Sequence, residues 1–241
     1  MTSTEIDVDQ GTVTVEKVVA IALDCFATGG FDDTRLESIA QRSGMSKRMI
    51  HYHFGDKRGL YVKALQLAIA RLRPDPSEMA LETEVPVEAM GKIVNAIYDC
   101  MVEEENSVRL VTMENLFGQA DMLRGAPLAD QSSVVLQMER ILMMGQDAGA
   151  FRPGIAAVDV YAIVASLCMF RVTNRATFAN LYGTDMTDEE NLDGMRRLVR
   201  DAVLAFLTSN MRNTGGMSYL VGTFGQTDGG AQSIYEDHSS L

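Results

Sequence analysis

Apolar side chains recur at the spacing of an α-helix along almost the whole chain, and this pattern restricts the fold more than any other feature. The first such segment has apolar residues at positions i, i+3, i+4, i+7, i+8 and i+11, which form one face of a helix. These residues are Val15, Val18, Val19, Ala22, Leu23 and Phe26. Apart from a short run at 219–221, the alternation typical of β-strands is absent. We therefore predict an all-α fold.

Local signals end the first helix and define a short second one. The Gly29-Gly30 pair is expected to stop the first helix, and Gly44 to end the second. Between them, Thr34 and Glu37 have the spacing of a capping box. In that motif the hydroxyl accepts a hydrogen bond from a free backbone N–H of the first turn, and the carboxylate accepts one from the backbone N–H of the capping residue.

Two more caps predict the third and fourth helices. Ser46 precedes a segment, Lys47–His53, that is expected to form a short third helix. Asp56 is expected to cap a fourth helix that runs to about Leu72. The first 73 residues are thus predicted to hold four helices, of which the second and third are short.

Prolines 74 and 76 interrupt the helical pattern, because proline lacks an N–H and restricts the residue before it. We place a functional boundary near residue 74, which need not be a flexible linker. The helices predicted after it are Val87–Glu104, Ser107–Phe117, Pro127–Ala148, 156–182 and 187–211. The expected parts are a flexible N-terminus at 1–13, helical domains at 14–73 and 74–212, and a mobile or docking tail at 213–241.

The charges are distributed unevenly along the chain. The formal net charge is −12, which at first argues against a nucleic-acid partner. Residues 34–73, however, contain nine basic and two acidic side chains, a net charge of +7. The remainder carries −19, so the two parts of the chain are expected to have different partners.

The cysteines, the N-terminal residues and the longest apolar run indicate where the protein is located in the cell. The cysteines Cys25, Cys100 and Cys168 lie far apart without CxxC spacing, which favours reduced thiols in a core over disulfides. The N-terminus is polar and acidic and shows no secretory signal. The longest apolar run, Ile155–Phe170, is shorter than the ~20 residues of a membrane span. We therefore expect a soluble, cytoplasmic protein without a membrane partner.

The second and third predicted helices flank the turn Ser43-Gly44-Met45-Ser46 and together predict a helix-turn-helix. The second helix of this motif can enter the major groove of double-stranded DNA. At its start, Lys47 and Arg48 carry donors suited to guanine, and Met49 could contact a thymine methyl group. The helix starts at Thr34 and Ser46 have free N–H groups that can bind phosphate. The predicted DNA-binding residues are Thr34, Arg35, Ser46, Lys47, Arg48, Met49, His51, Tyr52, His53 and Lys57.

Residues 14–65, about a fifth of the chain, resemble a known family. The segments that carry the resemblance are Phe26…Gly29-Gly30-Phe31, Thr34-Arg35-Leu36-Glu37-Ser38-Ile39-Ala40, Gly44-Met45-Ser46-Lys47 and Tyr52-His53-Phe54-Gly55-Asp56-Lys57…Leu60. They are similar to the DNA-binding domain of the TetR/AcrR family of repressors.

The resemblance implies a homodimer with about nine helices in each subunit. The first four would bind DNA, and the others would bind a small-molecule effector and form the dimer. By the same resemblance, Tyr52, His53 and Lys57 contact the DNA backbone. The base-reading positions fall on Lys47, Arg48, Met49 and His51. An aromatic residue is commoner in the family at position 51, which leaves open whether His51 contacts a base or a phosphate.

These features together predict a transcriptional regulator, by family habit a repressor that a ligand releases from its operator. The alternatives are a helical enzyme and an adaptor that uses the fold for protein contacts only. The sequence contains no nucleophile elbow, Walker loop or HExxH motif, so no catalytic residues or cofactors are expected. His51 and His53 project to nearly opposite sides of a helix, and no metal site is expected. Pairing of Lys47, Arg48 and Lys57 with carboxylates would favour the adaptor.

An effector pocket is expected inside the C-terminal helices. The predicted lining residues are Tyr98, Met101, Asn115, Phe117, Met138, Ile141, Arg171, Asn174 and Phe178. Arg171 and Asn174 lie in an apolar helix, where a buried polar group needs a partner. That partner could be an anionic ligand, a carboxylate such as Glu114, or the other subunit.

The last two long helices, at 156–182 and 187–211, carry more apolar residues than one bundle face can bury. We expect them to form the homodimer. A dimer would place two recognition helices about one DNA turn, 34–36 Å, apart on a palindromic operator.

Overall fold

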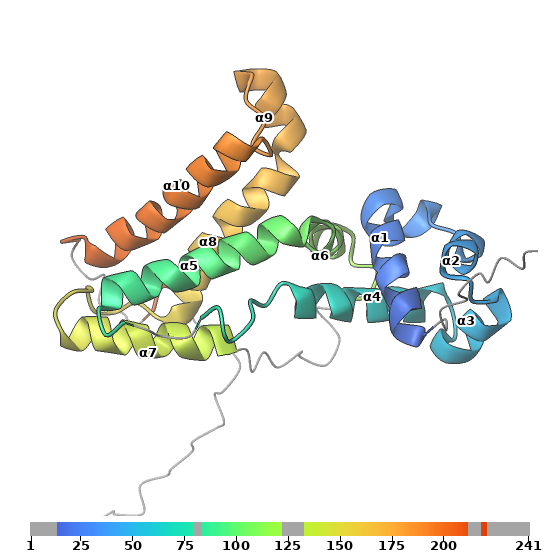
Figure 1. The fold of residues 1–241 in the computed structure, drawn as a ribbon, viewed down its shortest axis with the longest axis horizontal. Helices are drawn as coiled ribbons and strands as arrows, with labels where there is room; N and C mark the ends of the chain where they lie inside the picture. The colour runs from blue at the N-terminus through green and yellow to red at the C-terminus, as the bar shows by residue number, and fades with distance from the viewer. Residues whose placement is uncertain (1–13, 80–82, 122–132, 212–217, 221–241) are drawn as a thin grey trace, which may run out of the picture.

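The computed structural model describes residues 14–79, 83–121, 133–211 and 218–220. Over these residues the chain forms ten helices and no strands, so the all-α prediction is confirmed. Figure 1 shows α1–α4 gathered at one end of an elongated molecule and the other helices extending from them. Among the described residues no single helix has the length and hydropathy of a membrane span, although the bent pair Ala157–Thr173 and Arg175–Tyr182 reaches them together.

Helix α1, Val15–Asp33, starts where its apolar stripe starts. The hydroxyl of Thr14 accepts a hydrogen bond from the backbone N–H of Lys17 at 3.2 Å and caps the helix. The backbone leaves the helical conformation at Gly30, whose φ of 74° suits a residue without a Cβ. The glycine pair therefore interrupts the helix with a kink, although the bounds of α1 run on to Asp33.

The predicted capping box at Thr34 is wrong. Helix α2, Leu36–Ser43, has Arg35 as its N-cap, and no side chain caps it. The Thr34 hydroxyl is buried and donates instead to the carbonyls of Cys25 and Gly30, at 3.1 and 2.6 Å. It satisfies the end of α1, because the kink there leaves carbonyl groups without helical partners.

The next two caps are confirmed. Ser46 accepts from the N–H of Met49 at 3.3 Å at the start of α3, Lys47–Phe54. Asp56 accepts from the N–H of Gly59 at 2.7 Å at the start of α4, Lys57–Arg71. Helices α1–α4 share one apolar core, which includes Phe26, Ile39, Ile50, Leu60 and Tyr61.

The remaining helices form a bundle around a second core. Apolar side chains of α5, α7, α8 and α10 meet there. The bounds of these elements are α5 Pro86–Glu103, α6 Glu105–Phe117, α7 Ser133–Asp147, α8 Ala157–Thr173, α9 Arg175–Tyr182 and α10 Glu189–Thr208. The start predicted at Pro127 lies outside the described residues.

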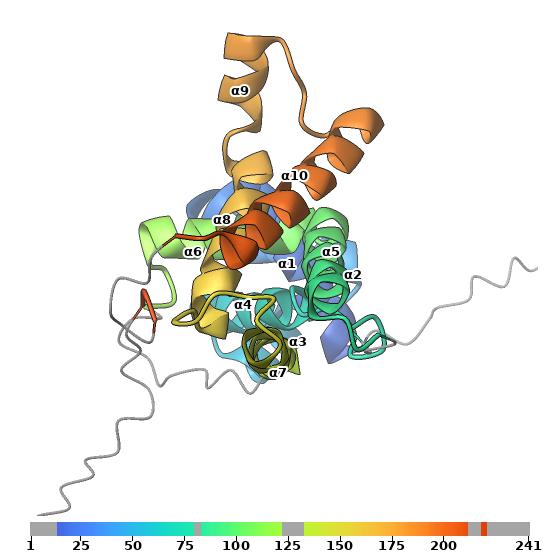
Figure 2. The ribbon, with the colours of Figure 1, turned by 90° about the vertical axis from the view of Figure 1, so that its left-hand side faces the viewer.

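The prediction of a single helix over 156–182 is wrong. The chain breaks at Asn174 (φ −115°, ψ 4°), and α9 leaves the axis of α8 by 72°. No residue of α9 is buried. Figures 1 and 2 both show α9 projecting away from the bundle.

Helix α6 joins the two helical parts. Leu110 is fully buried in the core of α1–α4 although it follows the proline boundary in the chain. Beside it, Asn106 donates to the carboxylate of Asp24 at 3.0 Å. Burial and the neighbouring Glu114 carboxylate raise the pKa of Tyr61. Helix α6 therefore packs directly on α1 and α4.

Candidate nucleic-acid interface

Helix α3 lies at the outer end of the molecule (Figure 1). Most of its side chains are exposed to solvent. Ile50 is its one fully buried side chain, and Met45 in the preceding turn is buried as well. Gly44 makes that turn possible, because its φ is 77°. The exposed side chains of α3 are Lys47, Arg48, Met49, His51, Tyr52 and His53.

Lys47 forms an ion pair with Glu37 of α2. The hydrogen bond from Lys47 lowers the pKa of Glu37. Both side chains are at least half exposed, so solvent screens the pair and a phosphate could replace the carboxylate. Pairing with carboxylates is the pattern that would favour an adaptor. Lys47 shows such a pair, but the pair is exposed to solvent.

Lys57 and Arg48 differ in their contacts with the rest of the chain. The ammonium of Lys57 donates to the carbonyl of Asp32 at 3.0 Å and lies 4.7 Å from the centre of the Phe31 ring. It therefore fixes the start of α4 to the end of α1. Arg48 is exposed and forms no ion pair with any described residue. Its guanidinium is free to reach a base edge.

The rings of Tyr52 and His53, near the end of α3, are arranged edge to face. Tyr52 is 79% exposed and lies 5.2 Å, centre to centre, from the ring of His53. The Nδ1 of His51 donates to the carbonyl of Gly55 at 2.8 Å. That bond orients the His51 ring at the end of the helix and leaves Nε2 for an outside partner.

Arg35 and Thr34 have opposite environments at the start of α2. Arg35 is exposed, whereas Thr34 is buried and its hydroxyl is already bonded. Since no side chain caps α2, its first N–H groups can still face a phosphate. The Thr34 side chain itself is not part of that surface.

The nine predicted effector residues do not line one pocket. Tyr98, Met101, Met138 and Ile141 are packed into the C-terminal core, and the Tyr98 hydroxyl donates to the carbonyl of Leu192 at 2.9 Å. The inward placement of Asn115 and Phe117 is wrong, because both are exposed near the end of α6.

The partner of Arg171 is a carboxylate from its own chain. Its guanidinium donates to Glu105 at 3.3 Å and to the carbonyl of Met101 at 3.1 Å. Glu114, the carboxylate suggested from the sequence, instead accepts from the N–H of Ala120.

The remaining two predicted effector residues, Asn174 and Phe178, lie around the break after α8. The Asn174 amide donates to the Thr173 hydroxyl at 2.8 Å. The ring of Phe178 contacts those of Phe170 and Tyr182. Neither residue belongs to the buried core that contains Tyr98 and Met138.

Several hollows open on the surface, and two of them include a predicted lining residue. One, about 550 Å³, lies between α6 and the α8–α9 bend and includes Met113, Phe117, Val172 and Arg175. An apolar groove of about 440 Å³ lies between α8, α9 and α10 and includes Phe178. Helical periodicity identifies buried stripes, and residues at the rim of a surface groove do not follow it.

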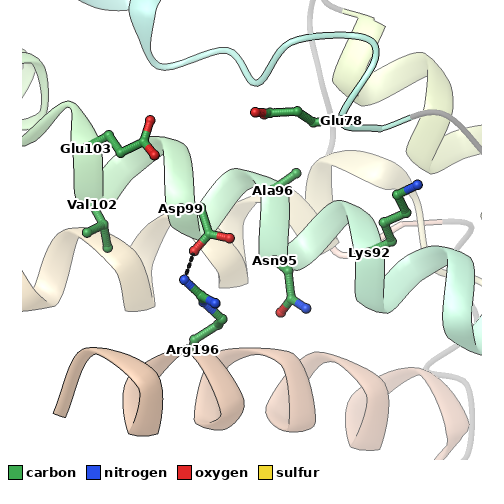
Figure 3. Close-up of a pocket in the computed structure, with 8 residues that line it drawn as sticks. All are labelled: Glu78, Lys92, Asn95, Ala96, Asp99, Val102, Glu103 and Arg196. Carbon is green, nitrogen blue, oxygen red and sulfur yellow. Dashed lines mark ion pairs between the residues drawn. The ribbon is translucent and has the colours of Figure 1, made fainter. Parts of the chain in front are cut away.

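A third hollow, about 430 Å³, is polar and lies between α5 and α10 (Figure 3). Arg196 of α10 forms an ion pair with Asp99 of α5 across it. Burial raises the pKa of Asp99 despite this pair. No group of three or more potential ligands among the described residues could hold a metal ion.

Two family models match the chain. The model described as "Bacterial regulatory proteins, tetR family" matches residues 18–64. The model described as "Tetracyclin repressor-like, C-terminal domain" matches residues 86–203. The chain belongs to the TetR family. It is therefore a DNA-binding transcriptional regulator and not an enzyme.

Individual proteins of known name support this membership. The HTH-type transcriptional repressor NicS of Pseudomonas putida is 28% identical over 188 residues, 78% of this chain and 89% of that protein. The regulator RutR of Escherichia coli is 32% identical over 111 residues, which are 46% of this chain and 49% of RutR. The repressor AcnR of Corynebacterium glutamicum is 26% identical over 178 residues, 73% of this chain and 88% of AcnR.

Solved structures share the TetR-family fold. SCO4942 from Streptomyces coelicolor has a TM-score of 0.56 at 20% identity, over 80% of this chain and 97% of that one. The TetR family regulator PfmR from Thermus thermophilus has a TM-score of 0.50 at 20% identity, over 84% of this chain and all of PfmR. At these identities the likeness concerns the fold alone.

Proposed function

We propose that this TetR-family regulator is a cytoplasmic repressor that binds a palindromic operator as a homodimer and leaves it when an effector binds. The observation that carries the proposal is the exposed surface of α3, which presents Arg48 and Tyr52 at the outer end of a family-matched domain. The relatives NicS and AcnR are both named repressors, which favours repression over activation.

Contacts to DNA are assigned by the position of each side chain. Arg48 and Met49 are placed to meet base edges at the start of α3, together with Lys47 once it leaves Glu37. Tyr52 and His53 are placed to meet phosphates at its other end. Phosphate contacts supply affinity for any sequence, whereas base contacts supply preference for one site.

Binding to the DNA upstream of the protein's own gene tests this proposal. Fluorescence anisotropy at several salt concentrations should show a sequence-selective complex that weakens as salt rises. Replacing Arg48 with alanine should reduce selectivity, whereas Lys63→Ala, which removes an exposed lysine of α4 outside the proposed surface, should not. A complex that forms equally well on unrelated DNA would contradict the proposal.

The groove between α6 and the α8–α9 bend is the best place for the effector. Met113, Phe117 and Val172 provide apolar contacts. Arg109 and Arg175 already donate to Glu105 and Asp185, and their remaining N–H groups provide donors for an anionic group. Leu110 of the same helix packs into the core of α1–α4. An effector that favours a different position of α6 would therefore change the affinity for DNA.

Helices α8 and α10 are the proposed dimer interface. Leu198 is 55% exposed and lies with Leu167 and Met195 in the apolar groove between α8, α9 and α10. The aromatic residues Phe170 and Phe178 continue this groove onto α9. A second subunit would cover these side chains, whose exposure to water is unfavourable.

A further inference from the structure

Three residues of the C-terminal tail contact the start of α8. The carboxylate of Asp159, in the first turn of α8, is only 4% exposed. It accepts from the Ser218 hydroxyl at 3.1 Å and from the N–H groups of Tyr219 and Leu220 at 3.1 and 2.9 Å. It also accepts from the N–H of Ala156 at 3.0 Å, the one of these bonds that caps its own helix.

The hydrogen bonds from the tail affect the ionisation of Asp159. Burial alone raises its pKa, but hydrogen bonds from Ala156, Tyr219, Leu220 and Ser218 outweigh burial and leave the pKa below 3.8. Each is a hydrogen bond to a charged acceptor, which is stronger than one between neutral groups. Asp159 is therefore an anchor for the tail as well as a helix cap.

Arg152 makes a second connection at the same place. Its backbone N–H donates to the carbonyl of Leu207 and its Nε to the carbonyl of Phe206, both at 2.9 Å. The guanidinium lies 4.2 Å from the Phe206 ring and 5.8 Å from the Tyr219 ring. Arg152 thus places a positive charge at the C-terminal end of α10 and against two aromatic faces.

Together these contacts join three parts of the chain. The region matched by the C-terminal family model ends at residue 203, so Phe206 and all three tail residues lie beyond it. Arg152 holds the end of α10, and Asp159 holds the tail that follows α10. The Tyr219 ring also lies 5.9 Å from the Phe206 ring, so the tail contacts the end of α10 as well as the start of α8.

We propose that Ser218, Tyr219 and Leu220 form a clasp that fastens the end of α10 to the start of α8 and so supports the surface on which two subunits pair. The first half of this inference stands on the contacts above, and the second half rests on the proposed dimer. An open clasp lets the last turns of α10 move relative to α8, and the dimer surface on these helices then loses its fixed geometry.

Leu220→Pro tests the clasp, with Leu220→Ala as its matched control. Both substitutions remove the leucine side chain, but only proline removes the N–H that donates to Asp159. Neither substitution touches α8 or its cap. The full-length protein is used in both cases.

Two measurements are expected to separate the variants. Hydrogen exchange at the Tyr219 amide should be roughly tenfold faster in Leu220→Pro than in Leu220→Ala or the parent. The dimer dissociation constant, measured by analytical ultracentrifugation, should rise roughly three- to tenfold in Leu220→Pro and remain unchanged in Leu220→Ala.

Each contrary result has a separate meaning. Parent amides at Tyr219 and Leu220 that exchange as fast as those of a free peptide would overturn the clasp. A dimeric parent whose dissociation constant is equal in both variants would overturn its link to subunit pairing. A parent that is monomeric at every concentration would contradict the proposed dimer itself, and would do so before any variant is made.

Discussion

The guanidinium of Arg171 donates to the carboxylate of Glu105 at 3.3 Å and so joins α8 to the first turn of α6. The Arg171 side chain is 3% exposed, and it also donates to the carbonyl of Met101 at the end of α5. Glu105 in turn accepts from Arg109 at 2.7 Å. One buried arginine therefore connects α8 to both α5 and α6.

Arg171→Met should lower the free energy of unfolding by roughly 2–3 kcal/mol, because it leaves Glu105 and the Met101 carbonyl without a buried donor. Arg109→Met is the matched control, since it removes the exposed partner of the same carboxylate and should cost much less. Urea denaturation of both variants measures the difference. Equal losses would show that burial of Arg171 adds nothing.

Acid should weaken this connection. Burial raises the pKa of Glu105, but Arg109 and Arg171 outweigh burial and leave it below the ordinary 4.5. A lowered carboxyl pKa contributes stability above the unfolded-state pKa, and that contribution is lost as the pH falls through the lowered value. Between neutral pH and pH 3 the parent should therefore lose more stability than Glu105→Gln, as measured by denaturant titrations at each pH.

Leu110→Ala should destabilise the α1–α4 core by roughly 2–5 kcal/mol, because it opens a cavity among fully buried side chains. Leu116→Ala, on the same helix but 71% exposed, should change stability by less than about 0.5 kcal/mol. Thermal unfolding of the two variants tests this. A small effect of Leu110→Ala would contradict the role of α6 in the N-terminal core.

Arg48→Ala and Lys57→Ala should affect DNA binding in different ways. Arg48→Ala should change the preferred site, since a base contact is worth roughly 1–3 kcal/mol of discrimination. Lys57→Ala should weaken binding to all sequences about equally, because the family resemblance implies that Lys57 contacts the DNA backbone. Selection from a randomised DNA library, followed by affinity measurements, distinguishes them. The assignment fails if both variants keep the site preference of the parent.

Leu198→Glu should convert the dimer to a monomer, because it places a charge in the apolar groove proposed to face the second subunit. Leu136→Glu is its control, since Leu136 is 62% exposed on α7, away from that groove. Sedimentation equilibrium gives the mass of each variant. A dimer that survives Leu198→Glu places the interface elsewhere.

Features that depend on near neighbours in the chain were predicted well from the sequence. The caps at Ser46 and Asp56 satisfy N–H groups three residues away, so the pattern alone was sufficient. Thr34 had the same pattern, but its hydroxyl found carbonyls of α1 instead. The kink at Gly30 provided those acceptors, and no local rule predicts which of two available partners a hydroxyl takes.

Residues facing distant parts of the chain were predicted less well. The sequence indicated that Arg171 needed a partner, but Glu105 lies 66 positions earlier and could not be chosen over Glu114. Helical phase predicts that Phe117 faces inward, but its side chain is 69% exposed at the last position of α6. The Asp159 anchor joins residues about 60 positions apart, and no periodicity marks it.

The sequence alone determined that the chain is helical, that a helix-turn-helix carries a basic surface, and that the chain belongs with TetR-like regulators. The first two features follow from side-chain periodicity, local caps and the sign of nearby charges, which act over a few residues, and the third follows from the resemblance of residues 14–65 to that family. The tertiary structure decided the bend at Asn174, the partners of Arg171 and Asp159, and the packing of α6 on the DNA-binding helices. Those outcomes depend on which surfaces and polar groups meet once the helices are packed, and desolvation then makes each unpaired group costly.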